Sequence, residues 1–106
     1  MPTEFVIAAS TGDLSPGEKK MIQLGKEYIM LANVDGSYFA VDVECTHAYA
    51  FLSMGPLDGE EVTCPLHGAV FNVKTGKALT APAQLPLMVY QVKVDGDDIL
   101  IGPPKG

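Results

Sequence analysis

All of the cysteines and histidines of this chain lie between residues 45 and 67. Cys45 and His47 are separated by one residue, and Cys64 and His67 by two. Thiolate and imidazole are the side chains that bind transition metals most readily. Two matched Cys/His pairs therefore constrain the fold strongly, because the chain has to bring two separate loops together around one site.

Strand patterns recur along the chain, whereas helix patterns are sparse. Several segments alternate apolar and polar residues with a period of two, which is typical of half-buried strands. The pairs Asp-Gly and Thr-Gly at 35–36, 58–59, 75–76 and 95–96 can take the positive φ of tight hairpin turns. We therefore predict an all-β protein, a small antiparallel sandwich or barrel. The predicted strands are 5–9, 19–24, 27–34, 37–43, 61–64, 69–73, 87–94 and 98–101.

The length and the apolar content indicate one soluble domain. A chain of 106 residues, 47% of them hydrophobic, can bury one modest core but not two, so we expect a single domain over residues 1–106. The N-terminal residues MPTEFVIAAS lack the basic start and long apolar run of a signal peptide. The longest uncharged stretch, 78–91, contains Pro82 and Pro86 and cannot form a spanning helix. We expect a cytoplasmic protein that does not contact a membrane.

The charge of the chain limits its partners. Thirteen acidic residues against seven lysines give a formal charge of −6, and a nucleic-acid partner would require a basic face, so we exclude one. An acidic surface can steer the protein toward a basic patch on a protein partner. It can equally serve only to keep the protein soluble.

Three arrangements of the four ligands can be compared. A disulfide between Cys45 and Cys64 is disfavoured in a reducing cytoplasm and leaves the histidines unexplained. Cys₂His₂ is a legitimate tetrahedral zinc set, but zinc sites usually pair Cys with Cys and His with His, and no helix pattern follows Cys64. Two loops that each supply a Cys and a His can instead place both thiolates on one iron and both imidazoles on its neighbour, as in Rieske [2Fe–2S] centres.

The motifs around these ligands resemble those of one family. Cys45-Thr46-His47 and Cys64-Pro65-Leu66-His67-Gly68 resemble the two cluster-binding boxes of Rieske proteins. The runs LSMGPLDG (52–59), HGAVFNVKTG (67–76) and PAQLPL (82–87) resemble the flanking pattern of small bacterial Rieske ferredoxins.

This resemblance implies the Rieske fold, which adds a cluster-binding subdomain of two hairpin loops to a β-sandwich base. The cluster-binding part is expected over about residues 44–72, and the remainder forms the base. One [2Fe–2S] cluster per chain is implied, with Cys45 and Cys64 on the inner iron and His47 and His67 on the outer, exposed iron.

Four further residues are expected to contact or shape the cluster site. Pro65 restricts φ so that Cys64 and His67 can converge, and Gly68 lets the backbone approach the inorganic sulfide. Leu66 lies inside the second box. The resemblance implies that the loop at Pro82 covers a third side of the cluster.

The sequence also predicts a low reduction potential. High-potential Rieske proteins carry two extra cysteines, and the matching positions here hold Ala50 and Leu66. They also carry a Ser and a Tyr hydroxyl after the His-Gly pair, and here these positions hold Ala69 and Phe71. Neither side chain can donate a hydrogen bond to sulfur, so we expect a potential near the low end of the Rieske range.

The chain is expected to be a carrier and not an enzyme, with no catalytic residue. It has no G-x-G-x-x-G fingerprint for a nucleotide or flavin and no spare histidine for a mononuclear iron site. The resemblance implies a monomeric one-electron carrier between a flavoprotein NAD(P)H ferredoxin reductase and the terminal oxygenase of a multicomponent aromatic-ring-hydroxylating dioxygenase. An uncharged rim is expected to dock on both partners: Tyr49, Phe51, Met54, Pro65, Leu66 and Pro82.

Two other functions stay open at this point. The small subunit of an assimilatory nitrite reductase has a similar Rieske-like fold and would be an integral enzyme subunit. A zinc-stabilised structural or interaction module would have no redox role.

Overall fold

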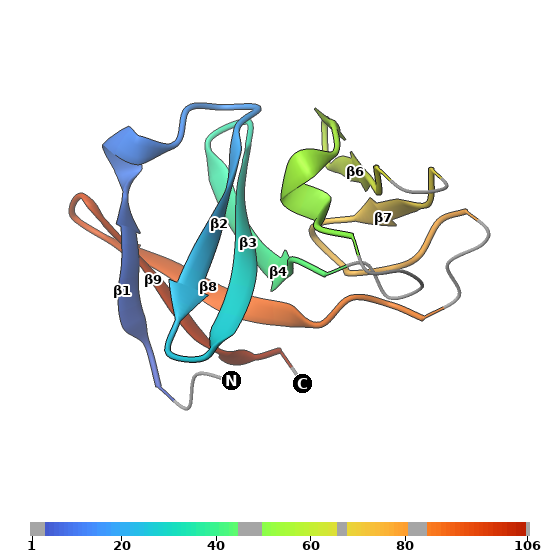
Figure 1. The fold of residues 1–106 in the computed structure, drawn as a ribbon. Coiled ribbons are helices and arrows are strands. Elements are labelled where there is room, and N and C mark those ends of the chain that lie inside the picture. Colours follow the sequence, from blue (N-terminus) through green and yellow to red (C-terminus); the bar gives the residue numbers. More distant parts are fainter. Residues whose placement is uncertain (1–3, 45–49, 66–67, 81–84, 106) are drawn as a thin grey trace.

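The structure, a computed structural model, describes residues 4–44, 50–65, 68–80 and 85–105. In these residues it has nine strands and two short 3₁₀ turns, arranged as a large sheet with a smaller one beside it (Figure 1). The large antiparallel sheet has the order β1-β9-β8-β4-β3-β2. Its strands are β1 (Val6–Ser10), β2 (Lys19–Leu24), β3 (Glu27–Val34), β4 (Ser37–Asp42), β8 (Val89–Asp95) and β9 (Asp98–Pro104).

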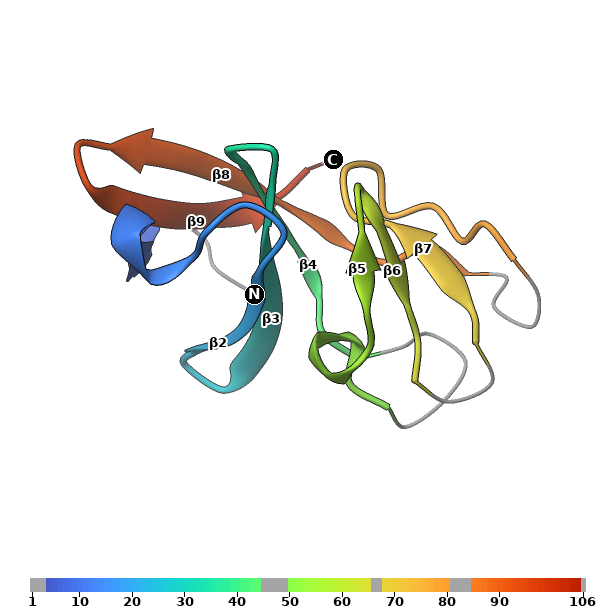
Figure 2. The same ribbon diagram turned by 90° about the horizontal axis from the view of Figure 1, so that it is seen from above.

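The small sheet is inserted between β4 and β8. It has the order β5-β6-β7, with β5 (Leu57–Asp58), β6 (Glu61–Thr63) and β7 (Val70–Asn72). The 3₁₀ turn η2 (Leu52–Met54) precedes it, and η1 (Thr11–Asp13) lies between β1 and β2. Figure 2 shows the small sheet on one side of the large one, with η2 next to β5 and β6.

The large sheet curls into a nearly closed barrel, because its two end strands β1 and β2 approach each other. One apolar cluster fills the inside of the barrel, and a second lies between the barrel and the small sheet. Strand β3 serves both: Ile29 and Leu31 point into the first cluster, and Met30 and Ala32 into the second. Alternate residues of a strand point to opposite faces, so β3 is buried on both sides.

One buried polar side chain fastens the barrel at the end of β3. Asn33 is 2% exposed, and its Nδ2 donates to the Leu14 carbonyl at 2.8 Å. Its Oδ1 accepts from the Gly36 amide at 2.8 Å. Both polar atoms of this buried side chain are therefore hydrogen-bonded. The same two bonds hold the segment before β2 against the β3–β4 turn.

The predicted all-β fold is confirmed. Eight of the nine strands lie within two or three residues of their predicted bounds, and the predicted turns have positive φ, for example at Asp35 (52°) and Gly59 (62°). Strand β5 was missed because two residues are too few to show an alternating pattern. Strand β3 differs from a half-buried strand, because the small sheet covers its second face. Neither helical turn in the described part of the chain could cross a membrane.

Candidate metal centre

Paired backbone joins the described residues on either side of both predicted ligand segments. In the first loop, the Leu52 amide donates to the Val43 carbonyl at 2.7 Å, and Glu44 forms an antiparallel bridge with Phe51. In the second, the Cys64 amide donates to the Ala69 carbonyl at 2.7 Å. The chain therefore enters and leaves each predicted ligand segment through paired backbone.

Of the four predicted ligands, Cys64 is the one that lies within the described residues. It is 1% exposed and belongs to the apolar cluster between the sheets, together with Leu52, Ala69 and Phe71. It forms no disulfide. A cysteine that is buried at the base of a tight turn is suited to hold the inner metal of a two-metal site, where protein covers the sulfur side.

The residues that flank the rest of the second box lie at the surface. Pro65 and Gly68 are both exposed, although they are close in sequence to the buried Cys64. Gly68 has φ +74°, which a residue with a Cβ rarely adopts. A Cβ at this position meets no described atom within 4 Å. Among the described residues, the backbone conformation is therefore the reason for a glycine at position 68. That its backbone approaches the inorganic sulfide stays a prediction.

The two loops are pressed together at Gly55. A Cβ on this residue would overlap the carbonyl oxygen of Thr63 and lie 3.2 Å from Cδ of Pro65. The Thr63 amide also donates to the Pro56 carbonyl at 3.0 Å. The turn η2, which leaves the first loop, is thereby seated against the start of the second. The sequence showed Gly55 only as part of a motif, because this crowding is between residues eight apart.

A third loop begins beside the second. The Leu79 amide donates to the Val70 carbonyl at 2.8 Å, and Oγ1 of Thr80 accepts from the Val70 amide at 2.9 Å. Val70 directly follows Ala69, which closes the second loop. The segment before the uncharged proline loop thus starts next to the predicted second ligand loop, and the sequence did not identify Thr80 as its anchor. Pro82 lies outside the described residues, so its place over the cluster stays a prediction.

The charged groups of the small sheet lie at its other end, where β5 turns into β6. Oε1 of Glu60 accepts one hydrogen bond from Nδ2 of Asn72 at 2.8 Å, and its Oε2 pairs with Nζ of Lys74 at 3.2 Å. The hydrogen bond from Asn72 and then the Lys74 ammonium hold the pKa of Glu60 below its usual value. Nζ of Lys74 also lies 5.5 Å from the centroid of the Phe39 ring, so this group ties the small sheet to β4.

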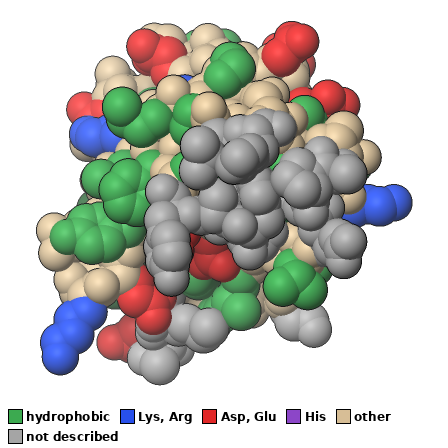
Figure 3. Space-filling view, turned by 45° about the vertical axis from the view of Figure 1, so that its right-hand side comes forward, with side chains coloured by type: hydrophobic (Ala, Val, Ile, Leu, Met, Phe, Trp, Pro, Cys, Tyr) green, Lys and Arg blue, Asp and Glu red, His purple; other side chains and the backbone are tan. Residues whose placement is uncertain are grey.

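Exposed apolar side chains surround the loop end. We call these residues the apolar rim: Phe51, Met54, Pro65, Leu79 and Leu85. Met54 is 78% exposed and Phe51 46%. Figure 3 shows hydrophobic side chains around the grey residues of this face, with acidic side chains both directly beside the grey atoms and farther out. The predicted exposure of Phe51, Met54 and Pro65 is confirmed.

The sequence did not place Leu79 and Leu85 in this surface, because nothing in their local pattern distinguishes an exposed leucine from a buried one. The predicted rim residues Tyr49, Leu66 and Pro82 lie outside the described residues. So do three of the four predicted ligands, Cys45, His47 and His67. The part of the chain that the structure describes holds no group of three or more Cys, His, Asp or Glu that could bind a metal. The ligand set therefore stays a prediction.

The described residues nevertheless fit a Rieske cluster. The donor whose position is known, Cys64, is buried, whereas Pro65 and Gly68 of the same box are exposed. This is the asymmetry of a centre with thiolates inside and imidazoles at the surface. An all-β barrel with two such loops defines the class of small iron–sulfur proteins of the Rieske type.

Residues 4–93 match the Rieske [2Fe-2S] domain family. The chain is 47% identical over 92 residues to the biphenyl 2,3-dioxygenase ferredoxin component of Rhodococcus jostii (strain RHA1), a match that covers 87% of this chain and 86% of that one. Among solved structures it is similar to the ferredoxin of carbazole 1,9a-dioxygenase from Nocardioides aromaticivorans IC177, with a TM-score of 0.89, 35% identity, and coverage of 95% and 99%.

A chain in the complex of reduced oxygenase and oxidized ferredoxin of carbazole 1,9a-dioxygenase also matches, with a TM-score of 0.91, 31% identity, and 98% of each chain covered. This chain belongs to the Rieske [2Fe-2S] domain family. The family assignment supports a Rieske-type cluster. It leaves no basis for the alternative of a zinc-stabilised structural module.

The contact at Gly55 predicts a large effect of one methyl group. Gly55→Ala is expected to lower the free energy of unfolding by about 1–3 kcal/mol, because the new Cβ must push η2 away from Thr63. Gly12→Ala is the control, since a Cβ there meets nothing within 4 Å. It should leave stability unchanged or raise it by up to about 1 kcal/mol. Urea unfolding measures both, and equal values for the two variants would contradict the seating of η2 on the second loop.

Proposed function

We propose that this chain passes single electrons from a flavoprotein NAD(P)H ferredoxin reductase to the terminal oxygenase of an aromatic-ring dioxygenase system. The chain is an electron carrier and not a catalytic enzyme, like the ferredoxin components it matches. The observation that carries the proposal is the match to such ferredoxins over 86–99% of their length. The same relatives favour a carrier over a nitrite reductase subunit.

Four side chains are assigned to the cluster. Cys45 and Cys64 hold the inner iron, and His47 and His67 hold the outer iron, with one cluster per chain. A Rieske cluster, when bound, takes up and releases one electron at a time. The burial of Cys64 and the closure of both loops by backbone hydrogen bonds support this assignment. Pro65, Leu66, Gly68 and Pro82 complete the surroundings of the cluster.

The same proposal includes the organisation of the chain. Residues 1–106 form one domain, in which about 44–72 bind the cluster and the remainder is the base. The apolar cluster shared by β3, β4 and the small sheet supports a single domain, because neither of its two parts buries these side chains alone. We also propose that the carrier is a cytoplasmic monomer without nucleic-acid or membrane partners.

The apolar rim is the surface through which the chain meets both partners. Electrons leave through the imidazole side of the cluster, so a partner has to cover the loop end. The apolar rim offers side chains that lose little on desolvation, and acidic residues around it can steer a basic partner. A shuttle has to dissociate after each transfer, so each contact is expected to be small.

Iron and sulfide analysis tests the cluster directly. Anaerobically purified protein should contain about two iron atoms and two acid-labile sulfides per chain, absorb visible light and give a Rieske EPR signal after reduction with dithionite. Zinc protein would be colourless. The absence of iron and sulfide, even after reconstitution, would overturn the proposed function.

The reduction potential is expected near the low end of the Rieske range, at about −150 mV. Ala69 and Phe71 are both fully buried and offer no hydroxyl to a sulfur, which supports this expectation. Protein-film voltammetry measures the potential. Phe71→Leu, which keeps an apolar side chain in the core, should leave it nearly unchanged. A clearly positive wild-type potential would contradict the prediction.

Met54→Glu tests the docking role of the apolar rim. A charge at this position should slow electron transfer to the cognate oxygenase at least severalfold, because the carboxylate has to be desolvated in the contact. Ile7→Glu is the control, since Ile7 is also highly exposed, at 65%, but lies on β1 of the barrel. Stopped-flow kinetics should show normal transfer for this control and an unchanged cluster spectrum for both variants. Equal rates for the two variants would refute the docking role.

A further inference from the structure

Asp42, the last residue of β4, is bound to the neighbouring strand β8 and the residue before it by three hydrogen bonds. Its amide donates to the Met88 carbonyl at 3.1 Å. Its Oδ2 accepts from the Met88 amide at 3.2 Å, and its Oδ1 accepts from the Tyr90 hydroxyl at 2.7 Å. The hydrogen bonds of this carboxylate thus replace those of a further residue pair between β4 and β8.

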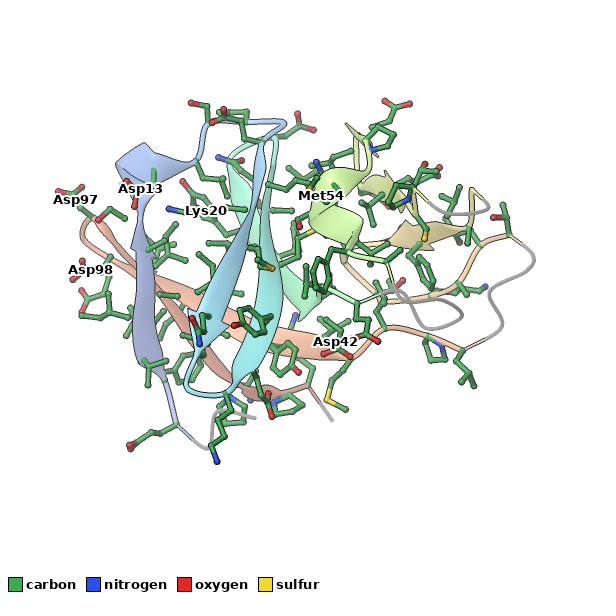
Figure 4. The ribbon with its side chains drawn as sticks, in the orientation of Figure 1. Asp13, Lys20, Asp42, Met54, Asp97 and Asp98 are labelled. Carbon is green, nitrogen blue, oxygen red and sulfur yellow. The ribbon has the colours of Figure 1, made fainter. Side chains whose placement is uncertain are left out.

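This clamp lies where the β4–β8 pairing ends. The two strands pair through Ala40 with Tyr90 and Val41 with Val89. Beyond Val41 the Asp42 side chain takes the place of a backbone carbonyl as acceptor for Met88. Figure 4 shows Asp42 at the end of the large sheet that faces the small one. From here β4 leads into the first ligand loop, and the chain arrives at Met88 from the third loop.

The carboxylate is held in a fixed place. Tyr90 is 3% exposed, and burial, followed by the hydrogen bond to Asp42, raises the pKa of its phenol well above the usual value. The hydroxyl therefore stays a donor at any ordinary pH. The donors that described residues offer to the carboxylate, the Tyr90 hydroxyl and the Met88 amide, are both neutral, so neither of them cancels its negative charge.

Asp42 is also close to the proposed cluster along the chain. Two residues lie between it and Cys45, so the Cα atoms of these two residues are at most about 11 Å apart. A negative charge at this range opposes the addition of an electron, because the low dielectric of the protein screens it weakly.

We propose that Asp42 is a positioning residue that sets the reduction potential of the cluster, by joining the roots of the first and third loops and by fixing one negative charge beside them. This inference rests on the proposed ligand set. Two effects follow that have opposite signs. Removal of the charge makes reduction easier, whereas removal of the Tyr90 hydroxyl leaves the charge less well screened and makes reduction harder.

Asp42→Asn isolates the charge. The amide can keep both side-chain contacts, with its oxygen toward the Met88 amide and its nitrogen toward the Tyr90 hydroxyl, which can accept. For a charge that acts over about 11 Å at an effective dielectric constant of about 20–40, Coulomb's law gives a rise of roughly three- to tenfold in the equilibrium constant for one-electron reduction. This is about 30–60 mV at 59 mV per tenfold change for a one-electron couple.

Asp35→Asn is the matched control for charge, since Asp35 is an exposed carboxylate in the β3–β4 turn at the other end of β4. It should leave the potential unchanged. Tyr90→Phe should shift the potential downward and speed the loss of visible absorbance in the presence of a chelator. Its control is Tyr38→Phe, because the Tyr38 hydroxyl contacts the Thr11 carbonyl away from the loops.

Voltammetry of the purified holoprotein decides the outcome. A rise for Asp42→Asn and a fall for Tyr90→Phe, with both controls unchanged, support the inference, since a purely structural role would not give shifts of opposite sign. Equal potentials for Asp42→Asn and Asp35→Asn overturn it. If Asp42→Asn assembles no cluster, Tyr90→Phe decides alone, and an unchanged potential overturns the inference. A wild-type protein without iron would instead refute the proposed function.

Discussion

The apolar contact between the small sheet and the outer face of β3 and β4 is the interaction on which the site depends. Met30 and Ala32 on β3 and Val41 on β4 meet Val62 and Phe71 on the small sheet. A fully buried side chain of this size contributes about 1.5–3 kcal/mol, which is more than any hydrogen bond at the loop ends. Cys64 and Ala69 belong to the same cluster, so the packing that joins the sheets also places the base of the second ligand loop.

The described residues at the roots of the two ligand loops are joined by backbone hydrogen bonds. Backbone hydrogen bonds close the first loop at Val43 and Leu52 and the second at Cys64 and Ala69. Gly55 then brings the two together, since only a residue without a Cβ can lie against Thr63. A metal centre with ligands from two loops needs such fixed roots, because free loops would lose binding energy to conformational entropy.

The distribution of charge agrees with a carrier that meets partners at its loop end. Glu60 and Lys74 neutralise each other at the opposite end of the small sheet, and the apolar rim is uncharged. Two carboxylates at the root of the first loop depart from this pattern: the exposed Glu44 and Asp42, which hydrogen bonds hold in place. The place of Asp42 suggests a division of labour in which the apolar rim serves contact with partners and a fixed charge near the cluster serves the potential.

Much of this protein could be predicted from its sequence by short-range patterns. The period-two strands and the glycine turns determined the all-β fold, since each depends on residues one to three apart. The two Cys/His boxes determined the family and the expected cluster, because ligand spacing is a local property of the chain. Only the tertiary structure decided which residues act at a distance. It buried β3 on both faces, seated Gly55 on Thr63, anchored the third loop at Thr80 and paired Asp42 with Tyr90. These contacts join residues 8 to 48 positions apart, and no local pattern specifies which distant atoms will meet.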